Sequence, residues 1–573
     1  MAEPGDPVMI VVGGGAIALS TAQELCALQG HRVVVLWRSD PDLGRAVEDI
    51  GAVFIAAARP DSGEGLERAG VRHAISILAL SPDDHLNLHA ALLARDLNPS
   101  IRIVLRQFNR TLAQKIEQNL PNCSVLSLAW HSAATYAAAA IDPSCFRGLQ
   151  FPEPDGPLTG FATRIVADCG LDGDTVAHAE RVLGARIIAV DGAIDFAPDA
   201  VLAGGAELVV YGEVVTLRGT APLRSVARGR PKIGGRLWSV LRRRRDHPPR
   251  LNPILTRLAV ATLAVFLVGS WYFHAVFGGA WLDAVYFVIA TMTTTGYGDV
   301  TPDRNHPVDI IAAMLLMLSG ITLTGLFIAF GASLLTRVHW VTMQGLRPVH
   351  HRGHIVVCGA GSIGSGVIDL LLGLAKRLVV VELNPDPTIV ERAREQHFDL
   401  LTGDASRDTT LDLCNLSAAH GLIALTNVDT LNLEIALGAR ARNPTMPIVL
   451  RIAEASFAES IARHFEFETT FSAAALAAPA FVGLSRFPGS RGRVSFAGQE
   501  FAVGEVIIGD DLRSALPSEA IPLAVARKQG GTIAYNFDEL YAGDRVLVMA
   551  PRAPLREGKD TLAAAAERLL QRS

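Results

Sequence analysis

The sequence predicts a helical membrane module placed between two Rossmann-type α/β units, each followed by a small α+β lobe. Of the 573 residues, 50% are hydrophobic, and the mean hydropathy of +0.30 is high for a soluble protein. Two long apolar segments lie near the middle of the chain, at residues 254–277 and 310–336. The order strand, glycine turn, helix and strand occurs before them, from Val8, and again after them, from His354.

Between the two apolar segments, residues 291–299 have the sequence Thr-Met-Thr-Thr-Thr-Gly-Tyr-Gly-Asp. An ion that leaves water needs replacement oxygens, and backbone carbonyls supply them when several successive residues turn the same way. Such a backbone requires φ values that L-residues resist, and Gly296 and Gly298 meet that requirement. We expect the Thr294 hydroxyl to add one more oxygen, and Tyr297 to point outward as a brace.

Residues 294–299 resemble the selectivity filter of potassium channels. Thr295 stands where Val or Ile is more usual in that family, and it keeps their β-branched shape. The resemblance implies that Asp299 braces the filter from behind, with Tyr286 of the preceding helix as its hydrogen-bond donor. It also implies that Gly298 completes the strained backbone and that K+ is bound by the carbonyl oxygens of Thr294, Thr295, Gly296 and Tyr297.

One such filter segment per chain cannot enclose an ion, because potassium-channel filters are built from four segments around one axis. We therefore expect a homotetramer in a lipid bilayer that conducts K+ passively and catalyses no reaction. Two alternatives stay open. One is a non-conducting regulatory subunit of a potassium transport system. The other is a membrane-anchored NAD(P)-dependent oxidoreductase, which would explain the Rossmann units but not the filter, and for which no convincing acid, base or nucleophile is evident.

The apolar segments predict two membrane-spanning helices. Residues 254–277 form the first span. The segment at residues 281–293 is too short to cross the membrane, so we expect it to be a re-entrant pore helix that leads into the filter. Residues 310–336 contain no charged side chain and form the second span. By resemblance to the inner helix of two-helix potassium channels, Gly320 matches the gating hinge. Close helix packing at small residues is the alternative role.

The flanks of the membrane module are basic. Residues 224–250 contain ten Lys or Arg and one acid, and the cations continue after the second span. This distribution fits the positive-inside rule better than nucleic-acid binding, for which the net charge of −5 makes no general case. We expect a multi-pass protein of the plasma or inner membrane with both termini in the cytosol. The acidic start of the chain predicts no signal peptide.

The glycine turn after the membrane module carries a complete dinucleotide-binding pattern. Residues 359–364 are Gly-Ala-Gly-Ser-Ile-Gly, and Glu382 ends the next strand about twenty residues on, where a carboxylate can bond ribose hydroxyls. We predict an adenine-nucleotide site for NAD(H) or for ATP or ADP, with AMP and cyclic dinucleotides also open. Its residues are Gly359, Gly361, Ser362, Ile363, Gly364 and Glu382.

The glycine turn near the N-terminus is a weaker candidate. Gly13 and Gly15 keep the pattern, but Ala18 replaces its third glycine. The second strand ends in Trp37 and Arg38, where a ribose-binding acid is expected. Nucleotide binding and a Rossmann fold kept only for structure both stay open here.

The two Rossmann-type units are copies of one another. The tripeptide at residues 86–88, Leu-Asn-Leu, recurs at 431–433, and Val-Leu-Arg at 104–106 recurs at 449–451, each 345 residues later. A constant offset over so long a stretch indicates duplication.

These units resemble RCK domains, the regulators of potassium conductance. The resemblance covers nearly the whole chain and includes Asp404 in Gly-Asp-Ala after the third strand, which adds Asp404 to the predicted nucleotide site. It implies a ring of eight RCK units in the tetramer, whose ligand pulls on the inner helices. Some family members bind calcium through acids that correspond here to Asn427, Arg451 and Ala453, so we expect no calcium at that site.

Seven segments are predicted: a first Rossmann lobe (1–145) and its C-lobe (146–221), a basic linker (222–252), the pore module (253–338), a second linker (339–353), a second Rossmann lobe (354–485) and its C-lobe (486–573). Two histidine groups were weighed as metal sites and disfavoured: His85 with His89, which lack a third ligand, and the loose cluster of His350, His351 and His354.

Overall fold

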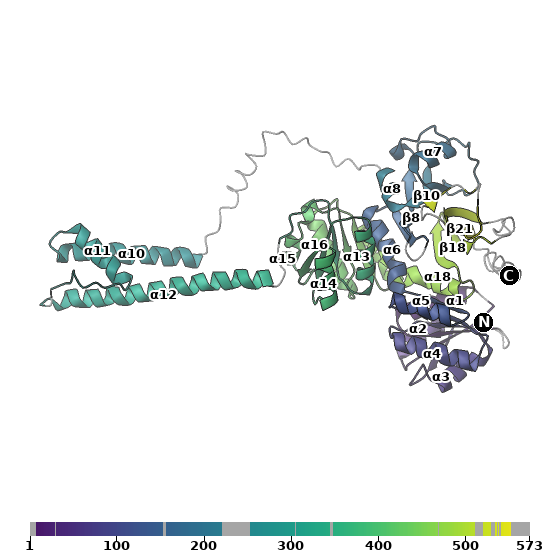
Figure 1. Cartoon of the computed structure of the whole chain (residues 1–573), viewed down its shortest axis with the longest axis horizontal. Helices are drawn as coiled ribbons and strands as arrows, with labels where there is room; N and C mark the ends of the chain where they lie inside the picture. Colours follow the sequence, from purple (N-terminus) through teal and green to yellow (C-terminus); the bar gives the residue numbers. More distant parts are fainter. Residues whose placement is uncertain are drawn as a thin grey trace. The chain divides into compact units, whose positions relative to one another are not determined.

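The structure, a computed structural model, describes residues 7–28, 30–152, 156–220, 253–303, 305–343, 348–467, 469–509, 520–528, 533–535, 537 and 540–551. The chain divides into two compact units: Met1–Pro222 together with Leu346–Ser573, and Leu223–Gly345 (Figure 1). We call them the α/β unit and the helical unit. The predicted basic linker at 222–252 lies outside the described residues.

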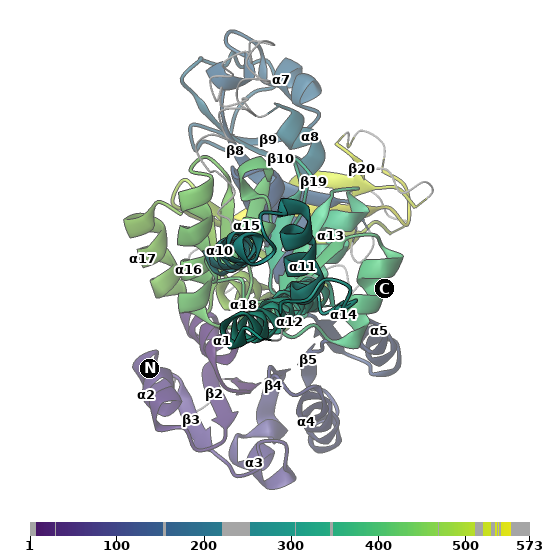
Figure 2. The ribbon, with the colours of Figure 1, turned by 90° about the vertical axis from the view of Figure 1, so that its left-hand side faces the viewer.

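The first Rossmann-type lobe is a six-stranded parallel sheet with the order β3-β2-β1-β4-β5-β6. Its strands are nearly continuous runs of Val, Ile, Leu and Ala because helices cover both faces of the sheet (Figure 2). The strands are β1 Val8–Val12, β2 Arg32–Trp37, β3 Val53–Ala56, β4 Ala74–Ala79, β5 Arg102–Arg106 and β6 Cys123–Leu126, and the helices α1 Ala16–Ala27, α2 Pro41–Asp49, α3 Gly63–Arg68, α4 Asp84–Leu97 and α5 Arg110–Asn119.

The second Rossmann-type lobe repeats this topology, with the order β13-β12-β11-β14-β15-β16. The duplication predicted from the constant offset is thus visible as the same strand order in both sheets. The strands are β11 Ile355–Cys358, β12 Leu378–Glu382, β13 Asp399–Thr402, β14 Gly421–Ala424, β15 Ile448–Ile452 and β16 Thr470–Ser472, and the helices α13 Ser362–Gly373, α14 Pro387–Glu395, α15 Asp408–Leu413, α16 Asp429–Arg442 and α17 Ala455–Phe465.

Each Rossmann-type lobe is followed by a small antiparallel sheet. The first has the order β7-β8-β10-β9 with helices α7 and α8, and the second has the order β17-β18-β21-β19-β20. In the second small lobe the described residues form strands only, so the helical part predicted for it is not seen there. The bounds are β7 Cys145–Gln150, β8 Leu158–Ile165, α7 Val176–Leu183, β9 Arg186–Val190, β10 Glu207–Glu213, α8 Val214–Thr220, β17 Ser490–Phe496, β18 Gln499–Ile507, β19 Ile521–Ala526, β20 Ile533–Ala534 and β21 Arg545–Pro551.

The two copies are joined by exchanged helices. Helix α6 (Leu128–Ile141), which follows the first sheet, packs on α13 of the second copy, and α18 (Ala473–Leu484), which follows the second sheet, packs on α1 of the first (Figure 1). Helix α6 is rich in alanine, and a Cβ added to Gly366 would lie 3.0 Å from Ala133 Cβ, so small side chains let the helices approach closely. One continuous hydrophobic core therefore contains residues of both copies.

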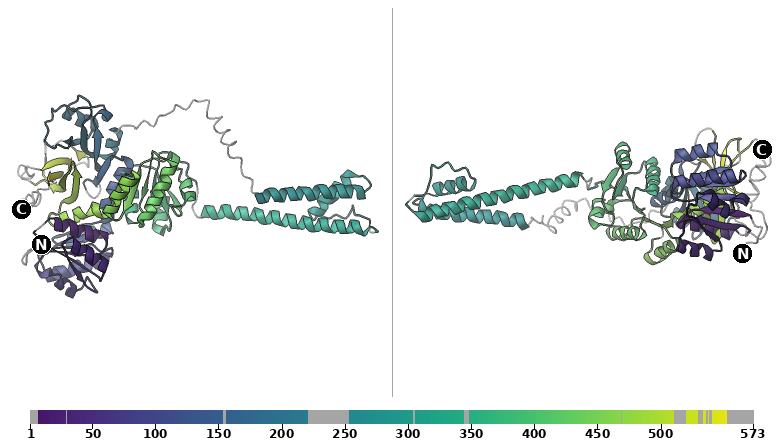
Figure 3. Two further views of the ribbon diagram at one scale, coloured as in Figure 1. Left: turned by 180° about the vertical axis from the view of Figure 1, so that it is seen from behind. Right: turned by 90° about the horizontal axis from the view of Figure 1, so that it is seen from below.

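The helical unit consists of α10 (Pro253–Val276), α11 (Trp281–Met292) and α12 (Pro307–Met343), with α10 and α12 side by side (Figure 3). The three predicted helical segments are present, and α12 extends beyond its predicted bounds at both ends. Among the described residues searched, one helical stretch, Pro307–Leu326, is long and apolar enough to cross a membrane by length and composition. The core of this unit is Phe273, Ala284, Phe287, Val288, Met292, Ala313 and Leu316.

Candidate functional site

The loop after α11 has an unusual backbone. The φ angles of Thr294, Gly296 and Gly298 are +61°, +54° and +77°, so left-handed residues alternate along the loop. The amides of Thr295 and Gly296 donate to the carbonyl of Ala290, at 2.9 and 3.1 Å, which ties the loop to the end of the helix. The two glycines adopt the conformation predicted for them, and Thr294 adds a left-handed position that the sequence did not indicate, since threonine rarely adopts it.

A tyrosine on α11 fixes the far end of this loop. The hydroxyl of Tyr286 donates to Asp299 Oδ2 at 2.8 Å, the contact expected from the sequence, and the amide of Val300 donates to Asp299 Oδ1 at 3.1 Å. Residues 293–299 are exposed in the single chain, and Tyr297 is 73% exposed. The loop is thus braced from one side and open on the other.

Gly320 lies where α12 passes the end of α11. A Cβ added to Gly320 would lie 2.6 Å from Met292 Cα and 2.7 Å from the Met292 carbonyl oxygen, distances that no side chain can occupy. The structure therefore gives Gly320 a packing role against the last residue of α11, just before the loop. Its role as a gating hinge stays a prediction.

The glycine turn between β11 and α13 is packed as a dinucleotide-binding turn requires. A Cβ added to Gly364 would lie 2.0 Å from the Gly359 carbonyl oxygen, so only glycine fits at this third position. Gly361 faces open space, and α13 begins at Ser362 with no side-chain cap on its N-terminal amides. Uncapped amides at a helix start are donors for a phosphate. Ile363 is buried behind them.

Two carboxylates follow the strands beside this turn. Glu382, the last residue of β12, accepts from the amide of Ala360 at 2.7 Å and from the amide of Asn384 at 3.2 Å. Asp404 follows β13, and its hydrogen bonds from Ser406 lower the pKa of its carboxyl group, which therefore stays ionised at neutral pH. The structure brings the predicted residues Gly359, Gly361, Ser362, Gly364, Glu382 and Asp404 to the carboxyl ends of β11, β12 and β13.

The first glycine turn is built differently. Its three glycine-pattern positions are Gly13, Gly15 and Ala18, with φ of +158° and +76° at the two glycines and Ala18 fully buried. An added Cβ at Gly14 would lie 2.3 Å from Nε1 of Trp37, so the indole lies against the turn. Trp37 and Glu382 hold the same position in the two sheets, as the last residues of β2 and β12. The Trp37 carbonyl accepts from the amide of Ala57 at 2.8 Å, and the Glu382 carbonyl accepts from the amide of Gly403 at 2.9 Å.

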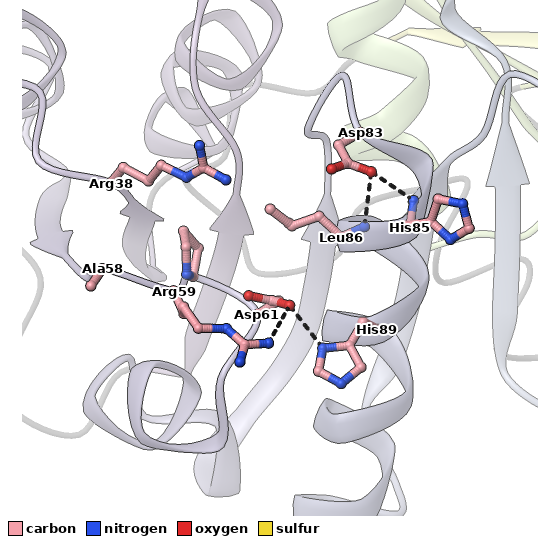
Figure 4. Close-up of a pocket in the computed structure, with 9 residues that line it drawn as sticks. Arg38, Ala58, Arg59, Asp61, Asp83, His85, Leu86 and His89 are labelled. Atoms are coloured by element: carbon pink, nitrogen blue, oxygen red, sulfur yellow. Dashed lines mark hydrogen bonds and ion pairs between the residues drawn. The ribbon is translucent and has the colours of Figure 1, made fainter.

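A pocket of about 460 Å³ opens at the carboxyl ends of β2, β3 and β4 in the first lobe (Figure 4). Arg38 extends into it, and on the opposite side Asp61 accepts from Arg59 at 3.3 Å and bonds His89 Nδ1 at 2.9 Å. Of the two histidines considered as metal ligands, His89 bonds Asp61, and the described residues contain no group of three or more His, Cys, Asp or Glu side chains that could hold a metal. Sequence reasoning noted Arg38 but missed the pocket, because Arg59 and Asp61 lie in the loop after a different strand, β3.

The other histidine and calcium candidates have structural partners. His354 Nε2 lies 2.8 Å from the Cys414 carbonyl oxygen, and His351 Nε2 lies 3.0 Å from Asp399 Oδ2. At the positions aligned with the calcium-binding acids, Arg451 donates to Asn427 at 2.8 Å. The Arg451 guanidinium thus contributes a positive charge at the positions aligned with those acids.

Comparison with known proteins identifies the domains. Sequence profiles of the TrkA-N domain match residues 9–122 and 355–472, and a profile described as "Ion channel" matches residues 260–337. Two Rossmann-type domains of the TrkA-N kind thus bracket an ion-channel domain, the domain order that the resemblance to channels with RCK domains predicts.

Curated relatives are similar over parts of the chain. Potassium channel protein 1 of Methanocaldococcus jannaschii is 25% identical over 199 residues, which is 34% of this chain and 59% of that protein. The voltage-gated potassium channel Kch of Escherichia coli is 24% identical over 30% of this chain and 42% of its own length. The calcium-gated potassium channel TvoK of Thermoplasma volcanium is 24% identical over 30% of this chain and 51% of its own length. The chain thus spans roughly half of each of these relatives.

Among solved structures, the GsuK channel bound to NAD aligns with 98% of this chain and 80% of its own, at 15% sequence identity and a TM-score of 0.49. A TrkA-N domain of the inner membrane protein YbaL from Escherichia coli aligns with 20% of this chain at 29% identity and a TM-score of 0.19.

Proposed function

We propose that the protein is a potassium-selective channel whose pore is gated by a nucleotide bound to its RCK domains. The observation that carries the proposal is the filter loop at residues 294–299, which combines a potassium-filter sequence with left-handed backbone at Thr294, Gly296 and Gly298. Its location in a segment that matches an ion-channel domain, and relatives named as potassium channels, support it.

In this proposal K+ binds the carbonyl oxygens of Thr294, Thr295, Gly296 and Tyr297. A single filter loop offers oxygens from one side only, and residues 293–299 are exposed in the single chain. Four chains around one axis would enclose the ion and cover this surface, so we propose a homotetramer with eight RCK units.

The proposed arrangement in the membrane follows from the helical unit. Helices α10 and α12 would cross the bilayer, and α11 would enter it only part of the way and lead into the filter. Both termini would stay in the cytosol. The seven-segment division of the chain, with the basic linker at 222–252 on the cytosolic side, is part of the same proposal.

The gating ligand in this proposal is an adenine nucleotide, NAD(H) or ATP or ADP, at the second glycine turn. The uncapped start of α13 would bind its phosphates, and Glu382 would exchange the amide of Ala360 for a ribose hydroxyl. A ligand biases the gate only through different affinity for the open and closed rings. The exchange at Glu382 is one place where such a difference can arise.

The test is potassium current through the purified full chain in a planar bilayer, with NAD, NADH, ATP and ADP perfused in turn onto the cytosolic face. We expect K+-selective current whose open probability changes when one of the nucleotides is added. Glu382→Ala should abolish this response. Glu391→Ala, at an exposed position on α14, is the control and should keep it. Gly296→Ala, which forces a side chain into a φ of +54°, is the non-conducting control.

Three other outcomes decide against parts of the proposal. Absence of current from folded protein indicates a non-conducting regulatory subunit. Current that ignores every nucleotide places the sensor elsewhere and leaves the second glycine turn structural. Turnover of NAD(P)H with a substrate would indicate the oxidoreductase alternative.

A further inference from the structure

The pocket in the first lobe occupies the position where a Rossmann fold binds the adenosine half of a dinucleotide. It is bounded by the residue after β2, the loop after β3 and the start of α4, at the carboxyl ends of the strands (Figure 4). Ligands of open parallel sheets bind at these ends. Its volume of about 460 Å³ is within the usual range for a small-molecule site.

The charges around this position are reversed relative to the second lobe. There, β12 ends in Glu382, and Asp404 follows β13, so two carboxylates lie where ribose hydroxyls would bind. In the first lobe β2 ends in Trp37, followed by Arg38, and the loop after β3 carries Arg59. A carboxylate selects a ribose with free hydroxyls, whereas an arginine at this position accommodates a phosphate on the 2′-oxygen.

The acids of the pocket are already engaged, and one guanidinium is free to bind an anion. Asp61 is shared by Arg59 at 3.3 Å and His89 at 2.9 Å, and Asp83 accepts from the first amides of α4. Among the described residues Arg38 forms no ion pair, and its guanidinium carbon lies 5.8 Å from the centre of the Trp37 ring. The Trp37 ring thus lies within cation–π range of Arg38. Figure 4 shows Arg38 on one side of the pocket and the Arg59–Asp61 pair on the other.

The glycine turn of the first lobe leaves room for the remaining phosphates. Gly15 precedes α1, faces open space and provides no side-chain cap for the helix amides. Alanine at the third position, here Ala18, occurs in dinucleotide-binding turns as an alternative to glycine. The turn is therefore compatible with a phosphate even though Trp37 lies against Gly14.

We propose that the first lobe binds an adenine nucleotide that carries a 2′-phosphate on its ribose, as in NADP(H), with Arg38 as the principal phosphate ligand and Arg59 as the second. The two lobes of one chain then select different nucleotides: the second takes a free ribose through Glu382, and the first takes a 2′-phosphorylated ribose. This site is separate from the second-lobe site described above, and neither proposal requires the other.

Isothermal titration of the purified full chain tests the proposal, in a Glu382→Ala background that removes the second-lobe carboxylate. The probes are 2′,5′-ADP, its isomer 3′,5′-ADP, and 5′-ADP; the two isomers have the same charge and differ only in the position of one phosphate. We expect 2′,5′-ADP to bind at least tenfold more tightly than 3′,5′-ADP. A charge-assisted bidentate contact predicts that Arg38→Ala weakens 2′,5′-ADP binding by about tenfold to a hundredfold and 5′-ADP binding by less than about threefold.

Arg72→Ala is the matched control, because Arg72 lies in the same lobe outside the pocket and is paired with Glu67. Arg38→Lys, which keeps the charge but not the fork of donors, should restore part of the affinity, and it replaces Arg38→Ala if that variant unfolds. Equal affinity for the two isomers would overturn the proposal, as would unchanged 2′,5′-ADP binding in Arg38→Ala. Displacement of 2′,5′-ADP by inorganic phosphate at similar concentration would show an anion site without nucleotide recognition and would also overturn it.

Discussion

Tyr286 donates a hydrogen bond of 2.8 Å to Asp299, and this bond joins the middle of α11 to the residue that follows the last filter glycine. The filter loop is therefore attached at both ends. At its start the amides of Thr295 and Gly296 are bound to the carbonyl of Ala290, and at its end the carboxylate is bound to the tyrosine. A second tyrosine–aspartate bond, from Tyr272 to Asp309 at 2.7 Å, connects α10 with α12 and does not touch the loop.

Tyr286→Phe should loosen the filter. Removal of this charge-assisted hydrogen bond leaves Asp299 without its donor on α11, so we expect inactivation to become severalfold faster in single-channel recordings in bilayers, with K+ still permeant. Tyr272→Phe is the matched control and should leave inactivation within about twofold of the original rate while lowering thermal stability. An unchanged inactivation rate in Tyr286→Phe would show that the bond does not hold the conducting filter.

Gly320→Ala should impair the filter whether or not Gly320 is a hinge. The new methyl group would lie 2.6 Å from Met292 Cα, and overpacking of this kind costs about 1–3 kcal/mol. Gly325, one turn and a half further along α12, has no atom within 4 Å of an added Cβ. We expect Gly320→Ala to reduce unitary conductance or the thermal midpoint, and Gly325→Ala to change neither. If both variants conduct normally and differ only in open probability, the hinge role gains support and the packing role is excluded.

Tyr136→Phe should weaken the pairing of the two RCK copies. The Tyr136 hydroxyl donates to the Phe471 carbonyl oxygen at 2.9 Å, and both belong to the interface made by the exchanged helices. Removal of the hydroxyl leaves a partly buried carbonyl without this donor, which costs about 1 kcal/mol. Urea denaturation of the detergent-solubilised chain should show a lower midpoint at unchanged slope. A midpoint equal to that of the original chain would mean that another donor or water replaces the hydroxyl.

The same interface should lose stability at low pH. Burial and a neighbouring guanidinium lower the pKa of His131, beside Arg147, and of His420, beside Arg218. Since the folded pKa lies below the ordinary value of 6.5, the folded protein binds fewer protons than the unfolded chain. The stability from the neutral imidazoles is thus fully present above about pH 6.5 and declines as the pH falls below it.

Thermal midpoints of the full chain at pH 7.5 and at pH 5.5 measure this dependence. His420→Gln should shrink the difference between the two midpoints, whereas the exposed His73→Gln should leave it unchanged. An equal pH dependence in His420→Gln and in the original chain would show that the Arg218–His420 contact does not contribute.

Sequence reasoning predicted the parts of this protein that depend on short local patterns. The glycines of the filter, the glycine turns and the parallel strands follow from backbone requirements that few residues satisfy. The Tyr286–Asp299 bond was within reach because thirteen residues separate the two and the helix fixes the direction of the tyrosine. The left-handed φ of Thr294 was not predictable, since threonine rarely adopts this conformation.

Contacts between segments that are distant in the chain could not be predicted from the sequence. The exchange of α6 and α18 brings Tyr136 to Phe471, 335 residues away, and no periodicity in either helix indicates its partner. The packing of Trp37 against Gly14 likewise required the sheet register, although the missing acid at that position was a signal that the first site differs.

The third position of the glycine pattern is Gly364 in the second lobe and Ala18 in the first, so each can be replaced by the residue of the other. Gly364→Ala would place a methyl group 2.0 Å from the Gly359 carbonyl oxygen and push the helix away from the turn. We expect it to lower the thermal midpoint and to reduce adenine-nucleotide binding at the second lobe by tenfold or more, because the helix amides lose their alignment with the phosphates. Ala18→Gly makes the opposite change in the first lobe, where the alanine is buried without a clash, and should cost only about 0.5–1 kcal/mol of helix stability. If Gly364→Ala binds nucleotide as well as the original chain does, the second turn does not hold the phosphates, and Glu382 would then be only a structural partner of the Ala360 and Asn384 amides.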